Sequence, residues 1–179
     1  MGLRGRRDQQ DFGFGELIEL RRTSGVRNVA AGFHIEQAVG LGNAFLDAAA
    51  ELVAEGADGI STTCGFLSLF QDQLSRHTRV PVATSTLLMV PLVQRLLPPD
   101  QKVGIITVSE PSLTAAHLTA VGVDPATPVT GTEVGRELTR VLIGDEPTLD
   151  VALAQQDLLE ASDRLLARHP EIGAFVFEC

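Results

Sequence analysis

The sequence is poor in the residues that cofactor chemistry most often needs. Its 179 residues include two cysteines, no tryptophan, no tyrosine and a single lysine, Lys102. A Schiff-base cofactor such as pyridoxal phosphate requires a lysine in its site, and Lys102 stands at the polar entry to an apolar, strand-like segment. We therefore expect any carbon-acid chemistry of this chain to proceed without a cofactor.

Positive charge is also scarce. The chain has 14 Lys and Arg residues against 23 Asp and Glu residues, which gives a formal net charge of -9. Proteins bind the phosphate backbone of nucleic acids through cationic side chains, and the eight phenylalanines show no alternation with basic residues. We therefore expect no nucleic-acid partner.

Long apolar runs and metal-ligand spacings are missing as well. The sequence has no apolar run of the roughly 18 residues that a membrane span needs, and its basic start leads into polar residues. We expect neither a membrane span nor a signal peptide, and a cytoplasmic location in which both cysteines are reduced. The four histidines share no ligand spacing with the cysteines, so no metal site is expected.

Short apolar segments alternate with amphipathic segments along the chain. Strands are predicted at 26–31, 57–63, 79–84, 102–108, 129–133 and 174–179, and helices at 35–55, 66–75, 85–97, 111–121, 134–143 and 147–168. Gly56 suits the end of the first helix, and Pro91 indicates a kink or a first turn. This alternation predicts an α/β fold with a mostly parallel sheet. The prolines at 98 and 99 are the best linker, between units 1–97 and 98–179.

Both cysteines fall where a predicted strand ends. Cys64 follows the strand 57–63 and precedes a helix, and Cys179 ends the strand 174–179. Ligands of parallel sheets bind outside the carboxyl ends of the strands, and a helix N-terminus lowers the pKa of a thiol. We therefore expect Cys64 to be a reactive thiol, although a small buried apolar side chain is the plain alternative. Glu178 is either part of the same site or an exposed carboxylate.

Four segments together resemble the aspartate/glutamate racemase superfamily, and its hydantoin racemase-like branch in particular. They are residues 56–66, 80–85, 103–108 and 174–179, and the resemblance covers 36–179. It implies two pseudo-symmetric α/β halves, 1–97 with Cys64 and 98–179 with Cys179, and a site between them. The implied activity is a cofactor-independent racemase or isomerase in which the two cysteines remove and return a proton. Gly65-Phe66 departs from the amino-acid racemase pattern and favours a hydantoin or another carbon acid.

The resemblance also implies a binding site for a small molecule with a carboxylate or carbonyl group. The residues at the strand ends that it assigns to the substrate are Thr63, Gly65, Thr84, Ser85, Thr107 and Ser109. Self-association of the chain is left open.

The resemblance further implies that the chain is a trimmed form of a longer protein. The first half has no convincing first strand, and the second half stops at Cys179, where the family continues with a helix. A terminal carboxylate disfavours the Cys179 thiolate, so weak or no activity is expected of these 179 residues. Two other functions stay open: a non-catalytic module that binds a small molecule, and a thiol redox protein. No role is predicted for residues 1–11.

Overall fold

The computed structural model describes residues 35–62, 64–144 and 146–178, with residues 35–42 and 44 described by their backbone alone. The predicted strand at 26–31 lies outside the described residues. So do two predicted site residues, Thr63 and Cys179.

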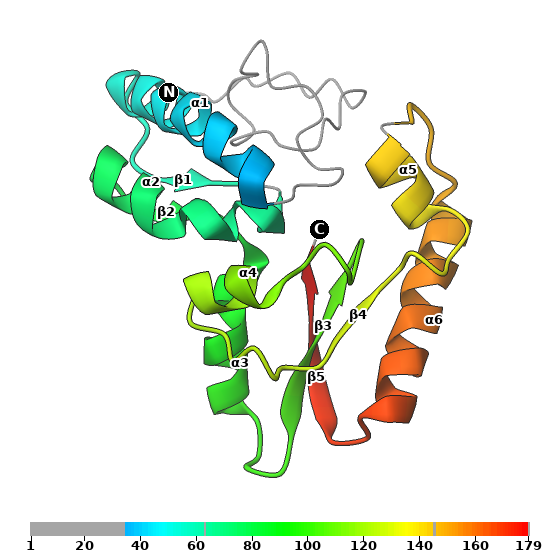
Figure 1. The fold of residues 1–179 in the computed structure, drawn as a ribbon. Coiled ribbons are helices and arrows are strands. Elements are labelled where there is room, and N and C mark those ends of the chain that lie inside the picture. Colours follow the sequence, from blue (N-terminus) through cyan, green and yellow to red (C-terminus); the bar gives the residue numbers. More distant parts are fainter. Residues whose placement is uncertain (1–34, 63, 145, 179) are drawn as a thin grey trace, which may run out of the picture.

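The described elements alternate between helices and strands (Figure 1). In chain order they are α1 (Ile35–Ala54), β1 (Ile60–Ser61), the 3-10 helix η1 (Gly65–Phe70), α2 (Gln71–Thr78), β2 (Val82–Ala83), the 3-10 helix η2 (Thr86–Met89), α3 (Val90–Leu96), β3 (Lys102–Thr107), α4 (Ala115–Ala120), β4 (Val129–Gly131), α5 (Leu138–Gly144), α6 (Val151–Arg168) and β5 (Ile172–Glu178). The chain is therefore a mixed α/β protein, as predicted.

The strands form two small parallel sheets. β1 pairs with β2, and the second sheet has the order β4-β3-β5, with every pair parallel. The prediction of parallel pairing is confirmed. Two pseudo-symmetric halves are not confirmed, because one sheet consists of two strands of two residues each, whereas the other has three longer strands. β1 and β2 are also much shorter than the strands predicted at 57–63 and 79–84.

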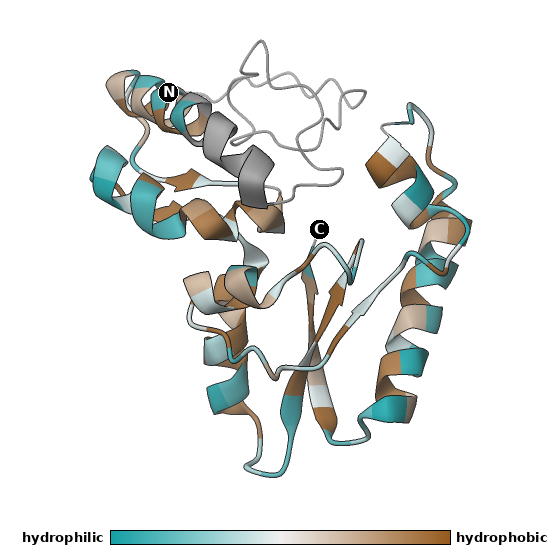
Figure 2. Ribbon diagram, viewed as in Figure 1, coloured by the Kyte–Doolittle hydropathy of each residue, from teal (hydrophilic) through white to brown (hydrophobic). Residues whose placement is uncertain are grey.

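One apolar core connects the two sheets. It contains Phe45 of α1, Phe66 and Phe70 of η1, Leu87 of η2 and Ile105 of β3, each less than a tenth exposed. In Figure 2 the hydrophobic residues concentrate on the strands and on the inward surfaces of the helices. The hydrophobic effect therefore holds η1 and η2 against the three-stranded sheet.

The three-stranded sheet has two different faces. Thr107 pairs in register with Glu178, and Ile105 with Val176, on the face that belongs to the shared core. On the other face α6 comes so close that a Cβ at Gly104 would stand 3.1 Å from Leu165. The register is irregular where β3 and β5 begin, since Lys102 pairs with Ile172 but Val103 with Ala174.

Local signals fix several helix ends. Gly56 has a φ of +98° and ends α1, as predicted, because glycine adopts this left-handed conformation without strain. Pro91 stands in the first turn of α3, where its missing N–H costs nothing. Asp150 accepts the N–H groups of Ala152 and Leu153 at 3.0 and 3.1 Å, so α6 begins at Val151 instead of 147. Among the described residues no helix is long and apolar enough to cross a membrane.

Candidate functional site

The carboxyl ends of four strands meet around one buried carboxylate, that of Glu178. Glu178 is the last residue of β5 and is 6% exposed. Its neighbours include Gly65 after β1, Ser85 after β2 and Thr107 at the end of β3. Three of the predicted substrate-binding residues are thus brought together, at the edge where parallel sheets bind ligands.

Hydrogen bonds fix the carboxylate of Glu178. Its Oε2 accepts the hydroxyl of Ser85 at 2.5 Å, the hydroxyl of Thr86 at 2.6 Å and the backbone N–H of Leu87 at 3.1 Å. The single hydroxyl hydrogen of Thr86 is shared, because the carbonyl of Phe177 lies 2.7 Å from the same oxygen. Ser85 is also the N-cap of η2, where its Oγ accepts Leu87 N–H at 3.0 Å. The start of η2 therefore holds the end of β5.

Gly65 provides the space for Glu178. A Cβ at position 65 would collide with the Oε1, Cδ and Cγ atoms of the Glu178 side chain. The resemblance assigned Gly65 to the substrate, and in the structure its missing side chain lets the carboxylate lie against the Gly65 backbone, where its charge acts on the Cys64 thiol. The residue thus acts on the site through Glu178.

Cys64 lies deep in the core, at the start of η1. It is 3% exposed, and its carbonyl accepts the N–H of Leu67 at 3.1 Å and the hydroxyl of Thr62 at 3.3 Å. Burial, together with a smaller effect of the negative charge of Glu178, raises the pKa of the thiol to about 11, although the backbone N–H groups of Phe66 and Leu67 act in the opposite direction. The predicted lowering of this pKa is therefore wrong. Two N–H groups of a short 3-10 helix do not outweigh the loss of water around the sulfur.

Thr107 presents a buried hydroxyl toward the same face as Glu178. The residue is 1% exposed, and its Oγ1 has no hydrogen-bond partner within the part of the chain that the structure describes. A buried hydroxyl without a partner is costly, so this position is suited to a ligand or a water molecule. Ser109 differs, because its Oγ lies 2.8 Å from the Oγ of Ser112 in the turn that follows β3.

Thr84 holds the end of β2 in place through Gln71. It is fully buried, and Oε1 of Gln71 accepts both its hydroxyl at 2.8 Å and its N–H at 3.1 Å. Its carbonyl accepts the hydroxyl of Thr62. Sequence reasoning missed Gln71, for which no signal exists, and Thr86, which the polar run 84–86 could have indicated.

A buried histidine stands behind Phe66. His117 is fully buried, and its ring meets the Phe66 ring edge-on, with centroids 5.4 Å apart. Its Nδ1 accepts the backbone N–H of Thr114 at 3.1 Å, which completes a capping box at the start of α4. Burial lowers the pKa of His117, against a smaller raising effect of the Thr114 backbone. The histidine therefore stabilises α4, which packs on η1 beside Cys64.

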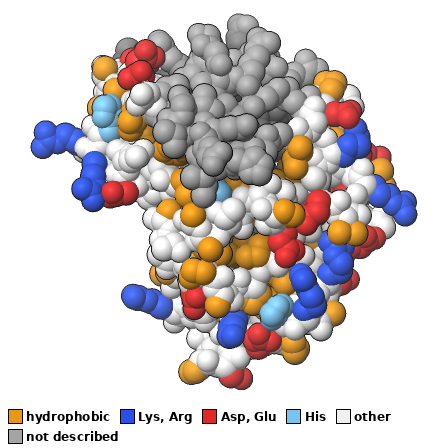
Figure 3. All heavy atoms as spheres, viewed as in Figure 1, with side chains coloured by type: hydrophobic (Ala, Val, Ile, Leu, Met, Phe, Trp, Pro, Cys, Tyr) orange, Lys and Arg blue, Asp and Glu red, His pale blue; other side chains and the backbone are white. Residues whose placement is uncertain are grey.

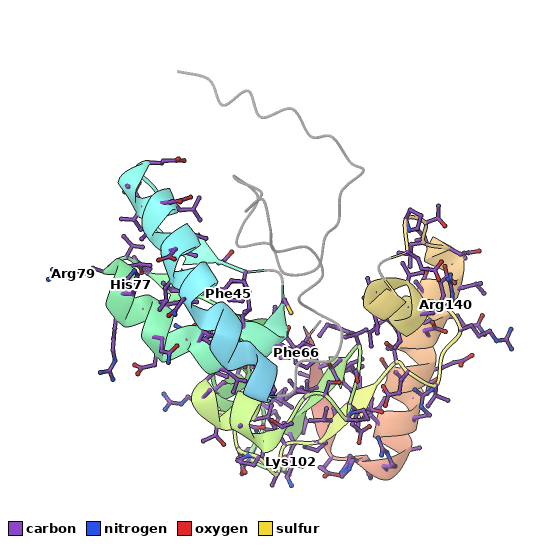
Figure 4. The ribbon with its side chains drawn as sticks, turned by 45° about the horizontal axis from the view of Figure 1, so that its top comes forward. Phe45, Phe66, His77, Arg79, Lys102 and Arg140 are labelled. Carbon is purple, nitrogen blue, oxygen red and sulfur yellow. The ribbon has the colours of Figure 1, made fainter. Side chains whose placement is uncertain are left out.

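Three basic side chains of the described residues stand away from this centre. Figure 4 shows Phe66 between the helices of the first sheet and the three-stranded sheet, whereas Arg79, Lys102 and Arg140 lie toward the periphery. Arg140 pairs with Glu137 at 2.9 Å and Glu146 at 2.7 Å. Among these charged groups, Glu178 is the one whose charge acts on the Cys64 thiol.

A separate open cavity of about 360 Å³ lies over the short sheet, lined by residues 59–61 and 81–83. None of the predicted site residues within the described part of the chain lines it. In the view of Figure 3 apolar side chains gather below the grey atoms, with acidic and basic side chains around them.

One comparison with known proteins finds a lyase. A dimethylsulfoniopropionate lyase from Durusdinium sp. clade D is 30% identical over 130 residues, which are 69% of this chain and 42% of the relative. The chain thus spans less than half the length of that relative. No family model and no solved structure matches the chain.

This finding corrects the functional expectation. The relative is a lyase, and nothing in the comparisons supports the aspartate/glutamate racemase superfamily, so that assignment and the racemase or isomerase activity are wrong. The physical reason is that the motifs consist of strand-end Ser, Thr, Gly and Cys residues. Such residues suit any carboxylate pocket of a parallel sheet and do not determine the reaction.

Proposed function

We propose that the protein is a lyase that eliminates dimethyl sulfide from dimethylsulfoniopropionate or a related sulfonium carboxylate. The observation that carries the proposal is a buried Cys64 thiol on which the charge of the buried Glu178 carboxylate acts, in a chain similar to a dimethylsulfoniopropionate lyase. A thiol and a carboxylate are the acid–base groups that such a reaction can use.

The reaction is a β-elimination that needs one base. The base takes a proton from the carbon next to the substrate carboxylate, and the electron pair of that C–H bond forms a double bond. The carbon–sulfur bond breaks, and its electron pair leaves with the sulfur as neutral dimethyl sulfide, so that acrylate remains. The leaving group requires no proton, so a single base is sufficient.

Cys64 is the base in this proposal, acting as its thiolate. The resting thiol has a pKa of about 11 and is protonated at neutral pH. A bound sulfonium places a positive charge near the Cys64 sulfur. This charge favours the thiolate, whereas the negative charge of Glu178 disfavours it. The substrate itself would therefore activate the base.

Thr107 is the best-placed partner for the substrate carboxylate, because its buried hydroxyl has no partner among the described residues. The remaining predicted substrate-binding residues stay in the proposal with weaker support: Thr63, Gly65, Thr84, Ser85 and Ser109. Cys179, which follows Glu178, stays as a second thiol. The proposed site lies between units 1–97 and 98–179, since Glu178 joins β5 to η2.

The test is product formation by the 179-residue chain. Incubation with dimethylsulfoniopropionate should yield acrylate, followed by proton NMR, and dimethyl sulfide, followed by gas chromatography of the headspace. Cys64→Ala should lower the rate by about 10²-fold or more. Ser162→Ala on α6, where the hydroxyl only bonds the carbonyl of Leu158, is the control and should leave the rate unchanged. Absence of acrylate, or an unchanged rate in Cys64→Ala, would refute the proposal.

A further inference from the structure

The charge on the proposed substrate has a counterpart in the site. Glu178 is 6% exposed, and its charge acts on the Cys64 sulfur. The carboxylate is held in one orientation by Ser85, Thr86 and Leu87. A fixed carboxylate in a region with little water acts more strongly on a nearby charge than an exposed one does.

A second observation is a buried hydrogen-bonding group that the described residues leave unpaired at this point. The Thr107 hydroxyl lies on the same face of the sheet as Glu178, in the paired position on β3, and has no partner among the described residues. A sulfonium carboxylate has a cation at one end and a carboxylate at the other. Glu178 and Thr107 suit these two ends, with Cys64 beside them.

Aromatic recognition of the cation is limited in this chain. Tryptophan and tyrosine, which bind onium groups best through their ring faces, do not occur in the sequence. Phe66, which stands two residues after Cys64, already contacts His117 through an edge-on ring pair. A carboxylate is therefore the group on which discrimination of a cation depends.

We infer that Glu178 is the specificity-determining residue of the site, and that its carboxylate selects ligands with a cationic dimethylsulfonio group over neutral ligands of the same shape. The inference rests on the proposed function for its choice of ligand. It assigns to Glu178 a role in binding, separate from the removal of the proton.

The experiment compares two ligands of equal shape. They are dimethylsulfoniopropionate and 4-methylpentanoate, in which a neutral CH replaces the sulfonium sulfur. Binding is measured by isothermal titration calorimetry in a Cys64→Ser background, which prevents turnover. We expect the sulfonium to bind about tenfold more tightly or better, and Glu178→Gln to bring the ratio of the two affinities close to one.

Two further variants separate charge from structure. Ser85→Ala removes a hydrogen bond to Oε2 but keeps the charge, so the ratio should persist. Thr107→Val should weaken both ligands alike, because both carry the same carboxylate. If Glu178→Gln does not fold, Glu178→Asp, which withdraws the charge by one methylene, takes its place and should lower the ratio.

Several outcomes would overturn the inference. They are equal affinities in the Cys64→Ser chain, an unchanged ratio in the Glu178 variant, or no binding of either ligand. Acrylate formation by the wild-type chain without a charge preference would leave the proposed function standing and refute this inference. A charge preference without acrylate formation would support this inference and refute the proposed function.

Discussion

Oδ2 of Asp157, in the middle of α6, accepts the backbone N–H of Leu138 at 2.8 Å, at the first residue of α5. The same carboxylate accepts the N–H groups of Glu137 at 2.7 Å and Arg136 at 2.9 Å. It thus caps a helix that lies earlier in the chain and joins α5 to α6. Burial raises the pKa of Asp157, but the three backbone donors outweigh it and lower the pKa overall.

Asp157→Asn should destabilise the protein by about 2–3 kcal/mol, because an amide group turns a donor toward backbone N–H groups. Urea unfolding at neutral pH measures the change, with the exposed Asp163→Asn on the same helix as control. The stabilisation by Asp157 is present above the unfolded pKa of 3.8 and is lost as the pH falls through the lowered folded pKa. Equal unfolding midpoints for the two variants would contradict the role of the cap.

His117 predicts a loss of stability in weak acid. Its folded pKa lies below the unfolded value of 6.5, so its contribution is complete above that value and is lost as the pH falls through the folded pKa. The melting temperature should therefore drop between pH 7.5 and 5, and less so in His117→Gln. His77→Gln, on the exposed side of α2, should keep the full drop. A drop of the same size in both variants would show that other groups cause it.

Cys64 should react slowly with iodoacetamide at pH 8, since only about 10⁻³ of a thiol with a pKa near 11 is ionised there. Peptide mapping by mass spectrometry separates its modification from that of Cys179. Glu178→Gln should move the pH profile of alkylation to lower pH, because it removes a negative charge that raises the pKa. A profile that stays in place would mean that burial alone protects the thiol.

Gly65→Ala should lower both stability and lyase activity, because the new methyl group overlaps the Glu178 carboxylate and displaces it. We expect a loss of about 1–3 kcal/mol in the free energy of unfolding. Gly59→Ala is the matched control, since its Cβ would stand at an ordinary 3.5 Å from the carbonyl of Pro81. If both alanines are tolerated equally, Gly65 does not position the carboxylate.

The sequence predicts elements whose signals are local. Gly56 at the end of α1 and Pro91 in the first turn of α3 each act through their own backbone, and both predictions are confirmed. The start of α5 could not be predicted, because its cap is Asp157, which stands 19 residues beyond Leu138. Tertiary contacts of this kind leave no trace in a local pattern.

The site was predicted only in part, for the same reason. The pattern of strand ends predicts Cys64, Ser85 and Thr107 as site residues, but the pKa of a thiol depends on burial, which the local sequence does not give. The sequence leaves the role of Glu178 open, because the position and orientation of its carboxylate depend on Gly65 and Ser85, which are distant in sequence. The reaction class was mistaken because strand-end residues describe a pocket and not its chemistry.

The register irregularity at the start of β5 places one more residue, Gly173, on β5 than on β3 before the regular pairing begins. The extra residue is taken up at this irregularity, so a chain without Gly173 would still pair Glu178 with Thr107 on the same face of the sheet. Side chains alternate along a strand, so a residue removed beyond Ala174 would instead turn Glu178 toward the opposite face. The length of the segment between Ala174 and Glu178 thus determines whether the carboxylate belongs to the site.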